Sequence, residues 1–286
     1  MNKVLVTGSN GQLGSEIRAL HRNYIDYKFL FTDFHDLDIT NHKAVNKLII
    51  NNKINVIINC AAYTAVDKAE NEPELADAIN HLAVANLARI SKKNNIKFFH
   101  ISTDYVFDGK NNRPYVEADM PNPLSQYGKS KLLGELAIQN IKSPNSIIIR
   151  TSWVYSKYGD NFIKKIINLA KEKEFLSVVD DQKGSPTHAR DLANTILKLI
   201  PHINGNNSKL FHYCNSGYCS WYDFAVEILR LKKINIDLKK AKSEDYNSMA
   251  LRPKFSPLDC SLISNLFPFI PQYDWKLSLK KFIDGF

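Results

Sequence analysis

The chain has 286 residues, of which 44% are hydrophobic, and it carries a formal net charge of +9. This length suits one large α/β domain or one domain with a smaller addition, and no run approaches the roughly 18 to 20 consecutive apolar residues of a membrane helix. The lysines stand singly or in pairs, without a stripe interleaved with aromatic residues, so we expect no nucleic-acid partner. A net positive charge fits an anionic small molecule as well as it fits a nucleic acid.

The first residues, MNKVLVTGSNG, lead directly into a strand and a turn without the pattern of a signal peptide. They predict a cytoplasmic protein with no membrane partner. The four cysteines form no CxxC pair, so zinc and disulfides are weakly indicated and reduced thiols are expected. These cysteines are Cys60, Cys214, Cys219 and Cys260.

Apolar runs alternate with helical patterns along the first two thirds of the chain. The predicted strands are Lys3–Thr7, Lys28–Thr32, Val56–Cys60, Phe98–Ser102, Ser146–Thr151 and Leu176–Val179. The predicted helices are Gly11–Leu20, Lys43–Asn51, Glu74–Lys93, Ser125–Asn140, Asn161–Lys173 and Ala189–Ile200. After Pro201 the pattern changes to a strand at Leu210–Asn215, a helix at Trp221–Leu231 and an amphipathic end at Leu277–Ile283.

Strands separated by helices predict βαβ units, and therefore an α/β fold with a Rossmann-type doubly wound parallel sheet and a smaller C-terminal α/β substrate domain. We expect a dinucleotide-binding domain from residues 1–150 plus about 176–200. The expected substrate domain comprises about 152–175 plus 205–286.

A glycine-rich turn, TGSNGQLG, joins the first predicted strand to the first helix. Glycines at this point allow a tight turn, and the helix presents backbone amides to a pyrophosphate. An ordinary glycine-rich loop is the alternative, but a strand before and a helix after are the context that the dinucleotide pattern requires. The candidate residues are Gly8, Asn10, Gly11, Gln12 and Leu13.

Asp33 follows the second predicted strand, roughly 20 residues after the last glycine of the turn. A carboxylate at this place accepts a hydrogen bond from a ribose hydroxyl and repels a 2′-phosphate, so we predict NADH or NADPH as cofactor with NADH favoured. Asp38 and Ile39 are candidates for the border of the adenine. Asp36 is interpreted as part of a solvated acidic turn.

Small residues follow the third predicted strand, at the edge of the sheet where a dinucleotide binds. They make Ala62, Tyr63, Thr64 and Ala65 candidates for the cofactor site, with tight packing as the alternative.

Two further motifs predict the chemistry. Tyr127 and Lys131 form a YxxxK pattern, which places both side chains on one face of a helix. The nearby ammonium is expected to lower the pKa of the phenol, so that Tyr127 transfers a proton. In STDYVFDG, residues 102–109, Thr103 can hydrogen-bond a substrate carbonyl and Asp104 a substrate hydroxyl. The alternatives are a surface helix for YxxxK, and a helix cap and turn for STDYVFDG.

Together these motifs resemble the extended short-chain dehydrogenase/reductase family and, within it, the dTDP-4-dehydrorhamnose reductases. The resemblance covers nearly the whole chain. It runs through TGSNGQLG, NCAAYTAVDKAE, STDYVFDG, YGKSKLLGE, RTSWVY, DQKGSPT and SWYDFA.

The resemblance implies an oxidoreductase of dTDP-rhamnose and polysaccharide biosynthesis. Its reaction would be the transfer of hydride to the 4-keto group of dTDP-6-deoxy-L-lyxo-4-hexulose. By position it assigns Thr103, Tyr127 and Lys131 to catalysis, and Tyr127 and Lys131 also to the cofactor. Thr103, Asp104 and Trp153 are assigned to the sugar. A tryptophan of the core is the alternative for Trp153.

Some members of the resembled group form a dimer bridged by magnesium through glutamates. Here Arg190 stands where a glutamate is expected, and Glu16 alone would not hold a divalent ion. We therefore predict no metal site, and a monomer or weak homodimer.

Two other functions stay open on the sequence. One is reduction of another nucleotide-linked 4-keto-6-deoxy sugar by the same catalytic residues. The other is a regulatory subunit that binds dinucleotide without turnover, against which the intact Thr103, Tyr127 and Lys131 argue.

Overall fold

The computed structural model describes residues 1–205 and 207–285, so residues 206 and 286 of the predicted substrate segment 205–286 lie outside the described residues. Six strands form a parallel sheet in the order β10-β5-β4-β3-β1-β2. They are β1 (Asn2–Thr7), β2 (Tyr27–Phe31), β3 (Val56–Asn59), β4 (Lys97–Thr103), β5 (Ser146–Thr151) and β10 (Lys209–His212).

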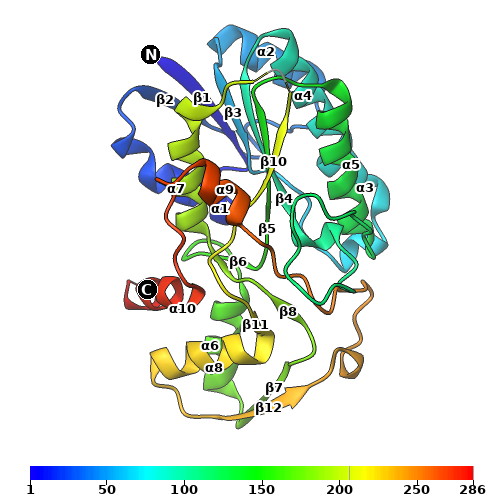
Figure 1. Cartoon of the computed structure of the whole chain (residues 1–286), viewed down its shortest axis with the longest axis vertical. Coiled ribbons are helices and arrows are strands. Elements are labelled where there is room, and N and C mark those ends of the chain that lie inside the picture. Colours follow the sequence, from blue (N-terminus) through cyan, green and yellow to red (C-terminus); the bar gives the residue numbers. More distant parts are fainter. Residues whose placement is uncertain (206, 286) are drawn as a thin grey trace.

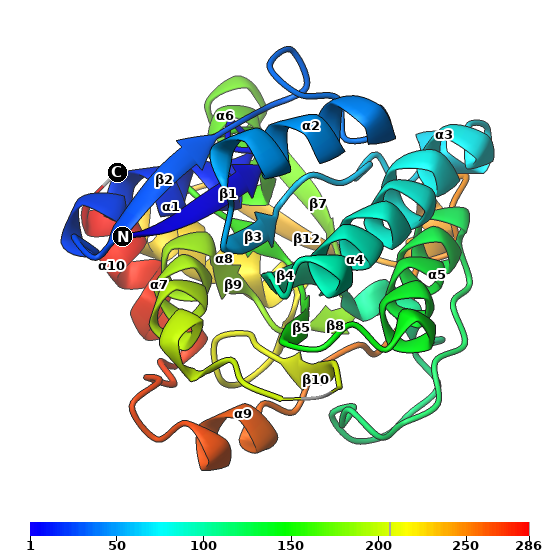
Figure 2. The same ribbon diagram turned by 90° about the horizontal axis from the view of Figure 1, so that it is seen from above.

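Helices cover both faces of this sheet (Figure 2). One face is covered by α1 (Gln12–Leu20) and α7 (Ala189–Leu199), with α9 (Ser261–Leu266) beside β10. The other face is covered by α2 (His42–Asn52), α4 (Ala83–Lys93) and α5 (Gln126–Ile141). The expected Rossmann-type doubly wound α/β fold is therefore confirmed.

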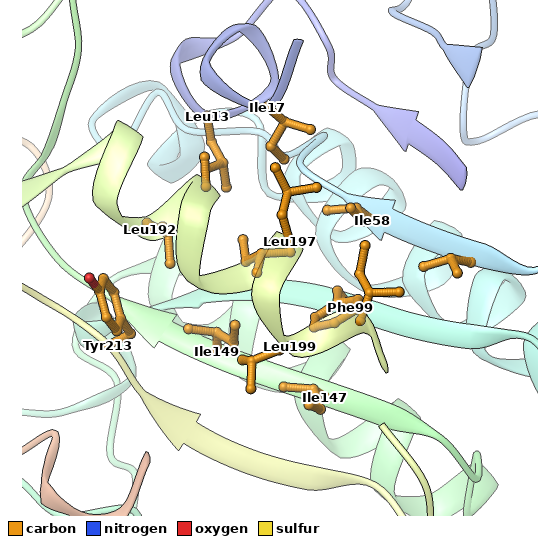
Figure 3. Close-up of a cluster of buried hydrophobic side chains, with 14 of the residues drawn as sticks. Leu13, Ile17, Ile58, Phe99, Ile147, Ile149, Leu192, Leu197, Leu199 and Tyr213 are labelled. Atoms are coloured by element: carbon orange, nitrogen blue, oxygen red, sulfur yellow. The ribbon is translucent and has the colours of Figure 1, made fainter. Parts of the chain in front are cut away.

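The two apolar layers follow from the alternation of side chains along a strand. In β1, Val4 and Val6 pack under α1 and α7, whereas Leu5 between them packs under α2 and α4. Figure 3 shows the first of these layers, where Ile58, Phe99 and side chains of β5 meet the leucines of α7.

A second group of elements lies beyond the carboxyl ends of the sheet strands, in the lower half of Figure 1. It has its own apolar cluster, which includes Ile163, Phe224 and Leu279. Its helices are α6 (Phe162–Glu172), α8 (Trp221–Lys232) and α10 (Trp275–Asp284), and its strands are β7 (Phe175–Val179) and β12 (Asp237–Ala241). Two-residue strands connect the two groups: β6 (Val154–Tyr155), β8 (Lys183–Gly184), β9 (Thr187–His188) and β11 (Cys219–Ser220).

Two predicted strands lie elsewhere than expected. The strand predicted at Leu176–Val179 is β7, which pairs with β12 outside the main sheet. The strand predicted at Leu210–Asn215 is β10, which extends the main sheet next to β5. The burial of β7 gives the physical reason. Its residues alternate between exposed and buried, whereas β5 is buried throughout, as a central parallel strand must be.

The predicted helix Glu74–Lys93 is continuous but not uniform. It consists of α3 (Pro73–Asp77), a π-helical turn η3 (Ala78–Leu82) and α4. Among the helices of residues 1–205 and 207–285, none has both the length and the apolar character that a membrane crossing requires.

Candidate active site

A cavity of about 720 Å³ lies between the carboxyl ends of the central strands and the lower group of elements. The strand ends belong to β1, β3, β4 and β5, and α8 contributes Trp221 from the opposite side. Most of the predicted site residues line it: Gly8, Gly11, Gln12, Leu13, Asp33, Asp38, Ile39, Ala62, Thr64, Thr103, Asp104, Tyr127, Lys131 and Trp153.

Three predicted cofactor residues are not among those lining the cavity: Asn10, Tyr63 and Ala65. The backbone N–H of Asn10 donates to Asp33 Oδ2 at 2.8 Å, so Asn10 helps to hold the Asp33 carboxylate in place. The hydroxyl of Tyr63 donates to Glu72, and its backbone N–H donates to the Asn80 side chain at 2.9 Å.

The glycine turn is packed so closely that larger residues would not fit. Gly8 has a φ of +62°, and a Cβ there would lie 2.5 Å from the backbone nitrogen of Ala61. A Cβ on Gly14, in the first turn of α1, would lie 2.4 Å from the carbonyl oxygen of Gly8. The helix therefore begins directly against the turn, and its first residues, Gln12 and Leu13, line the cavity.

Asp33 is fixed at the end of β2 by two amide donors, the N–H groups of Asn10 and Phe34, both at 2.8 Å. This carboxylate stays beside the glycine turn without a cationic partner in the described ion pairs. Asp38 accepts hydrogen bonds from the N–H and hydroxyl of Thr40, so its own turn fixes it.

At the end of β4, Thr103 and Asp104 begin the short helix η4 (Asp104–Val106). The Thr103 hydroxyl caps this helix by accepting from Tyr105 N–H, and it donates to Asp104 Oδ1 at 3.1 Å. Asp104 Oδ2 accepts a 2.6 Å hydrogen bond from Ser256. Burial raises the pKa of Asp104 to about 6, although these hydrogen bonds act against it.

Tyr127 and Lys131 lie one turn apart in α5, whose N-cap Ser125 accepts from Gly128 N–H. The expected lowering of the Tyr127 pKa is wrong. Burial raises the pKa of Tyr127 to about 12, and Asp104 adds to this while the Thr103 hydroxyl opposes it. Burial also lowers the pKa of Lys131 to about 8, despite the nearby Glu135 and Cys60.

Lys131 does not offset the effect of burial on the pKa of Tyr127, because its side chain is directed elsewhere. Its Nζ lies 2.6 Å from the Ile101 carbonyl oxygen and 3.4 Å from His100 Nε2, toward the sheet. A shared helix face brings two residues together, but it does not decide where a long lysine side chain ends.

Trp153 follows β5 with a φ of +48°, a conformation uncommon for a residue with a side chain. Its ring stacks on Trp221, with centroids 3.4 Å apart and an angle of 6° between the planes. On another side it contacts Gly184, where a Cβ would lie 2.5 Å from the indole. Because its ring is stacked on Trp221 and packed against Gly184, Trp153 forms a rigid part of the cavity wall.

Glu16 and Arg190, the residues compared above with the magnesium-binding glutamates, form an ion pair. Glu16 is buried, accepts from Ser156 at 2.7 Å and lies 3.5 Å from Arg190. Within the described part of the chain, no group of three or more His, Cys, Asp or Glu residues is arranged to hold a metal ion.

The family model described as RmlD substrate binding domain matches residues 1–286. A dTDP-4-dehydrorhamnose reductase from Aggregatibacter actinomycetemcomitans is 41% identical over 289 residues, which cover 98% of each chain. The chain belongs to the dTDP-4-dehydrorhamnose reductase family.

Solved structures agree with this assignment. The dTDP-4-dehydrorhamnose reductase of Clostridium acetobutylicum is 44% identical, covers 99% of each chain and gives a TM-score of 0.93. The enzyme of Bacillus anthracis, solved in complex with NADP, is 38% identical, covers 100% of each chain and gives a TM-score of 0.94. As a member of this family, the chain is an oxidoreductase that uses a nicotinamide dinucleotide.

The residues that line the cavity fit such a cofactor. The glycine turn and the Asp33 carboxylate line one cavity, and this combination suits a pyrophosphate beside a group that carries hydroxyls. Sequence reasoning missed several lining residues, among them Ser152 and Asp160, whereas Trp221 was an aromatic candidate for the substrate side with a core or helix-start role as the alternative. SWYDFA was part of the resemblance, but the place of Trp221 opposite Trp153 depends on contacts between distant segments.

Proposed function

We propose that this protein reduces the 4-keto group of dTDP-6-deoxy-L-lyxo-4-hexulose to give dTDP-L-rhamnose, with Tyr127 as proton donor. The observation that carries the proposal is the burial of Thr103, Tyr127 and Lys131 in one wall of the cavity that also holds the glycine turn and Asp33. A reduced nicotinamide bound there supplies hydride to the carbonyl carbon.

The protein's own residues complete the reduction. The pKa of Tyr127, raised to about 12 by burial, keeps its phenol protonated at neutral pH, as a proton donor must be. The carbonyl oxygen receives the phenolic proton as the carbonyl carbon receives hydride, so the ketone becomes an alcohol. The Thr103 hydroxyl lies within hydrogen-bond reach of Tyr127, and it supports the same oxygen when its hydrogen turns from Asp104 Oδ1 to the substrate. The Lys131 ammonium is held toward the sheet but lines the same cavity, so its positive charge, not a described hydrogen bond, favours the phenolate that remains until it is reprotonated.

The sugar is proposed to lie between Asp104 and the Trp153 ring. Asp104 offers a buried carboxylate to a sugar hydroxyl, and the Trp153 indole, held by Trp221 and Gly184, lines the same cavity. We further propose that the dinucleotide binds mainly to the six-stranded sheet and its helices. The substrate then binds mainly to the lower group. In this division β7 belongs to the lower group and β10 belongs to the six-stranded sheet.

NADH is proposed as the preferred coenzyme. The Asp33 carboxylate is held in place by two amides and has no described ion-pair partner, so its charge would repel a 2′-phosphate. The NADP in the Bacillus anthracis structure makes a direct comparison of both coenzymes the informative experiment.

The test of the proposed function is NADH oxidation, followed by absorbance, with freshly generated dTDP-6-deoxy-L-lyxo-4-hexulose. We expect turnover, with dTDP-rhamnose identified by chromatography. Binding of NADH without its consumption would contradict the proposal. Other nucleotide-linked 4-keto-6-deoxy sugars would then be tried, and turnover of none would favour a dinucleotide-binding regulatory subunit.

A further inference from the structure

Four polar side chains form a continuous line inside the protein, from the glycine turn to Lys131. Thr7 Oγ1 lies 2.6 Å from Asn59 Oδ1, and Asn59 Nδ2 lies 3.2 Å from His100 Nδ1. His100 Nε2 lies 3.4 Å from Lys131 Nζ. Thr7, Asn59 and His100 occupy neighbouring positions in β1, β3 and β4, so the pairing of the strands aligns them.

This line is buried to an extent that is unusual for polar groups. The exposed fractions are 1% for Thr7, 1% for Asn59, 0% for His100 and 2% for Lys131. The preceding residues of β3 are all apolar, and apolar residues at these positions would avoid the cost of desolvating polar groups. A fully buried polar network that ends at a residue of the active site indicates a role in the reaction.

The network fixes the end of a flexible side chain. An ammonium has three hydrogens, and two acceptors lie beside Lys131 Nζ, the Ile101 carbonyl and His100 Nε2. Since Lys131 also lines the cavity, its third hydrogen is the one left for a bound molecule.

His100 has to be neutral to accept a hydrogen bond from an ammonium. Burial and the neighbouring Lys131 both keep the pKa of His100 well below its ordinary value. A neutral ring that accepts at Nε2 carries its proton on Nδ1, which then needs an acceptor. Asn59 provides this acceptor when its amide is turned so that Oδ1 faces His100 and Nδ2 faces Thr7. The two ends of an amide have nearly the same shape, so the side chain fits either way.

We propose that His100, supported by Asn59 and Thr7, is a positioning residue that holds the Lys131 ammonium in place and in its charged form. The inference rests on the proposed function, in which Lys131 stabilises the Tyr127 phenolate. The other titratable groups around Lys131 are Cys60 at the end of β3 and Glu135 in α5. Neither replaces His100 in the hydrogen bonds described for Lys131 Nζ.

The test compares His100→Phe with His100→Gln over a range of pH. Phenylalanine removes the acceptor, so we expect the alkaline limb of kcat/KM to move down by about one pH unit, because the buried ammonium loses its stabilisation. We expect kcat at neutral pH to fall roughly tenfold. Glutamine keeps an acceptor, and we expect its alkaline limb to lie within about 0.3 pH units of the wild type.

A second variant tests the far end of the line. Thr7→Val removes the hydroxyl that orients Asn59, and we expect a shift of about half a pH unit in the same direction. It also carries the test if His100→Phe does not fold. Ser91→Ala is the control, because it removes a buried hydroxyl of α4 that does not line the cavity. An alkaline limb unchanged in both His100→Phe and Thr7→Val would overturn the proposal, as would an equal shift in Ser91→Ala.

A readout without the sugar separates this inference from the proposed function. NADH binding is measured by fluorescence over the same pH range, and we expect affinity to be lost at lower pH in His100→Phe than in the wild type. If the wild type binds NADH but does not reduce the keto sugar, the proposed function fails. The pH dependence of binding still decides the role of His100.

Discussion

At the scale of single residues, the pKa values of the site differ from what residue types alone suggest. Burial, more than neighbouring charge, determines the states of Tyr127, Lys131 and Asp104. In Tyr127→Phe the proton donor is lost while the ring remains, so we expect kcat to fall roughly 10² to 10⁴-fold. The NADH dissociation constant should change little. Tyr24→Phe, which removes a hydroxyl bonded to Asn194, is the control. Near-normal turnover of Tyr127→Phe would exclude the tyrosine as donor.

The raised pKa of Asp104 predicts that the stability of the protein without substrate depends on pH. Its folded pKa of about 6 lies above the unfolded value of 3.8, so its contribution is fully present below pH 4 and is lost as the pH rises through 6. The difference corresponds to up to about 3 kcal/mol. We expect Asp104→Asn to gain stability relative to the wild type between pH 4.5 and 7.5 in urea denaturation. A constant difference across this range would contradict the prediction, and the exposed Asp26→Asn is the control.

Asp33 determines the expected choice of coenzyme. In Asp33→Asn the negative charge is removed, and we expect the ratio of kcat/KM for NADPH to that for NADH to rise at least about tenfold. Steady-state kinetics with both coenzymes measures this ratio. Asp36→Asn, three residues further and not among the residues lining the cavity, should leave it near the wild-type value. A wild type that already prefers NADPH would refute the role given to Asp33.

At the scale of elements, a close contact between two helical segments supports the wall of the site. A Cβ on Gly134 of α5 would lie 2.2 Å from the carbonyl oxygen of Asn80, within the π-helical turn η3. Asn80 in turn binds the backbone of Tyr63 and the hydroxyl of Ser130, near the cavity. A π-helical turn widens the backbone here and aims Asn80 at these partners.

Gly134→Ala is therefore expected to destabilise the protein by about 1 to 3 kcal/mol, although alanine favours a helix, because the Asn80 backbone cannot move freely. Urea denaturation measures the loss. The exposed Gln139→Ala on the same helix should change stability by less than about 0.5 kcal/mol. Equal stability of Gly134→Ala and the wild type would mean that the two segments separate easily.

At the scale of the whole molecule, we predict that divalent metal determines neither activity nor association. Arg190 and Ser156 already engage the buried Glu16. We expect a chelator to leave NADH oxidation unchanged, and sedimentation with and without magnesium to give the same monomer or weak dimer. A wild-type dimer that forms only with magnesium would contradict this prediction. If Arg190→Glu forms such a dimer and the wild type does not, Arg190 is the residue that prevents the metal bridge.

The sequence by itself determined the central strands, the glycine turn and the motifs at the strand ends. These features are local: an apolar run such as Val4–Val6 must be buried, and a turn that packs like Gly8 against Ala61 needs glycine. A parallel sheet then brings the carboxyl ends of its strands to one edge, which is why Thr103, Asp33 and the glycine turn line one cavity.

Only the tertiary structure decided which strands pair and where long side chains end. The places of β7 and β10 depend on partners far along the chain, and the stack of Trp221 on Trp153 joins segments 68 residues apart. The direction of Lys131 depends on His100 and Ile101 in another element, and the pKa of Tyr127 depends on how completely the fold removes water. These are properties of long-range contacts and of burial, and sequence spacing does not contain them.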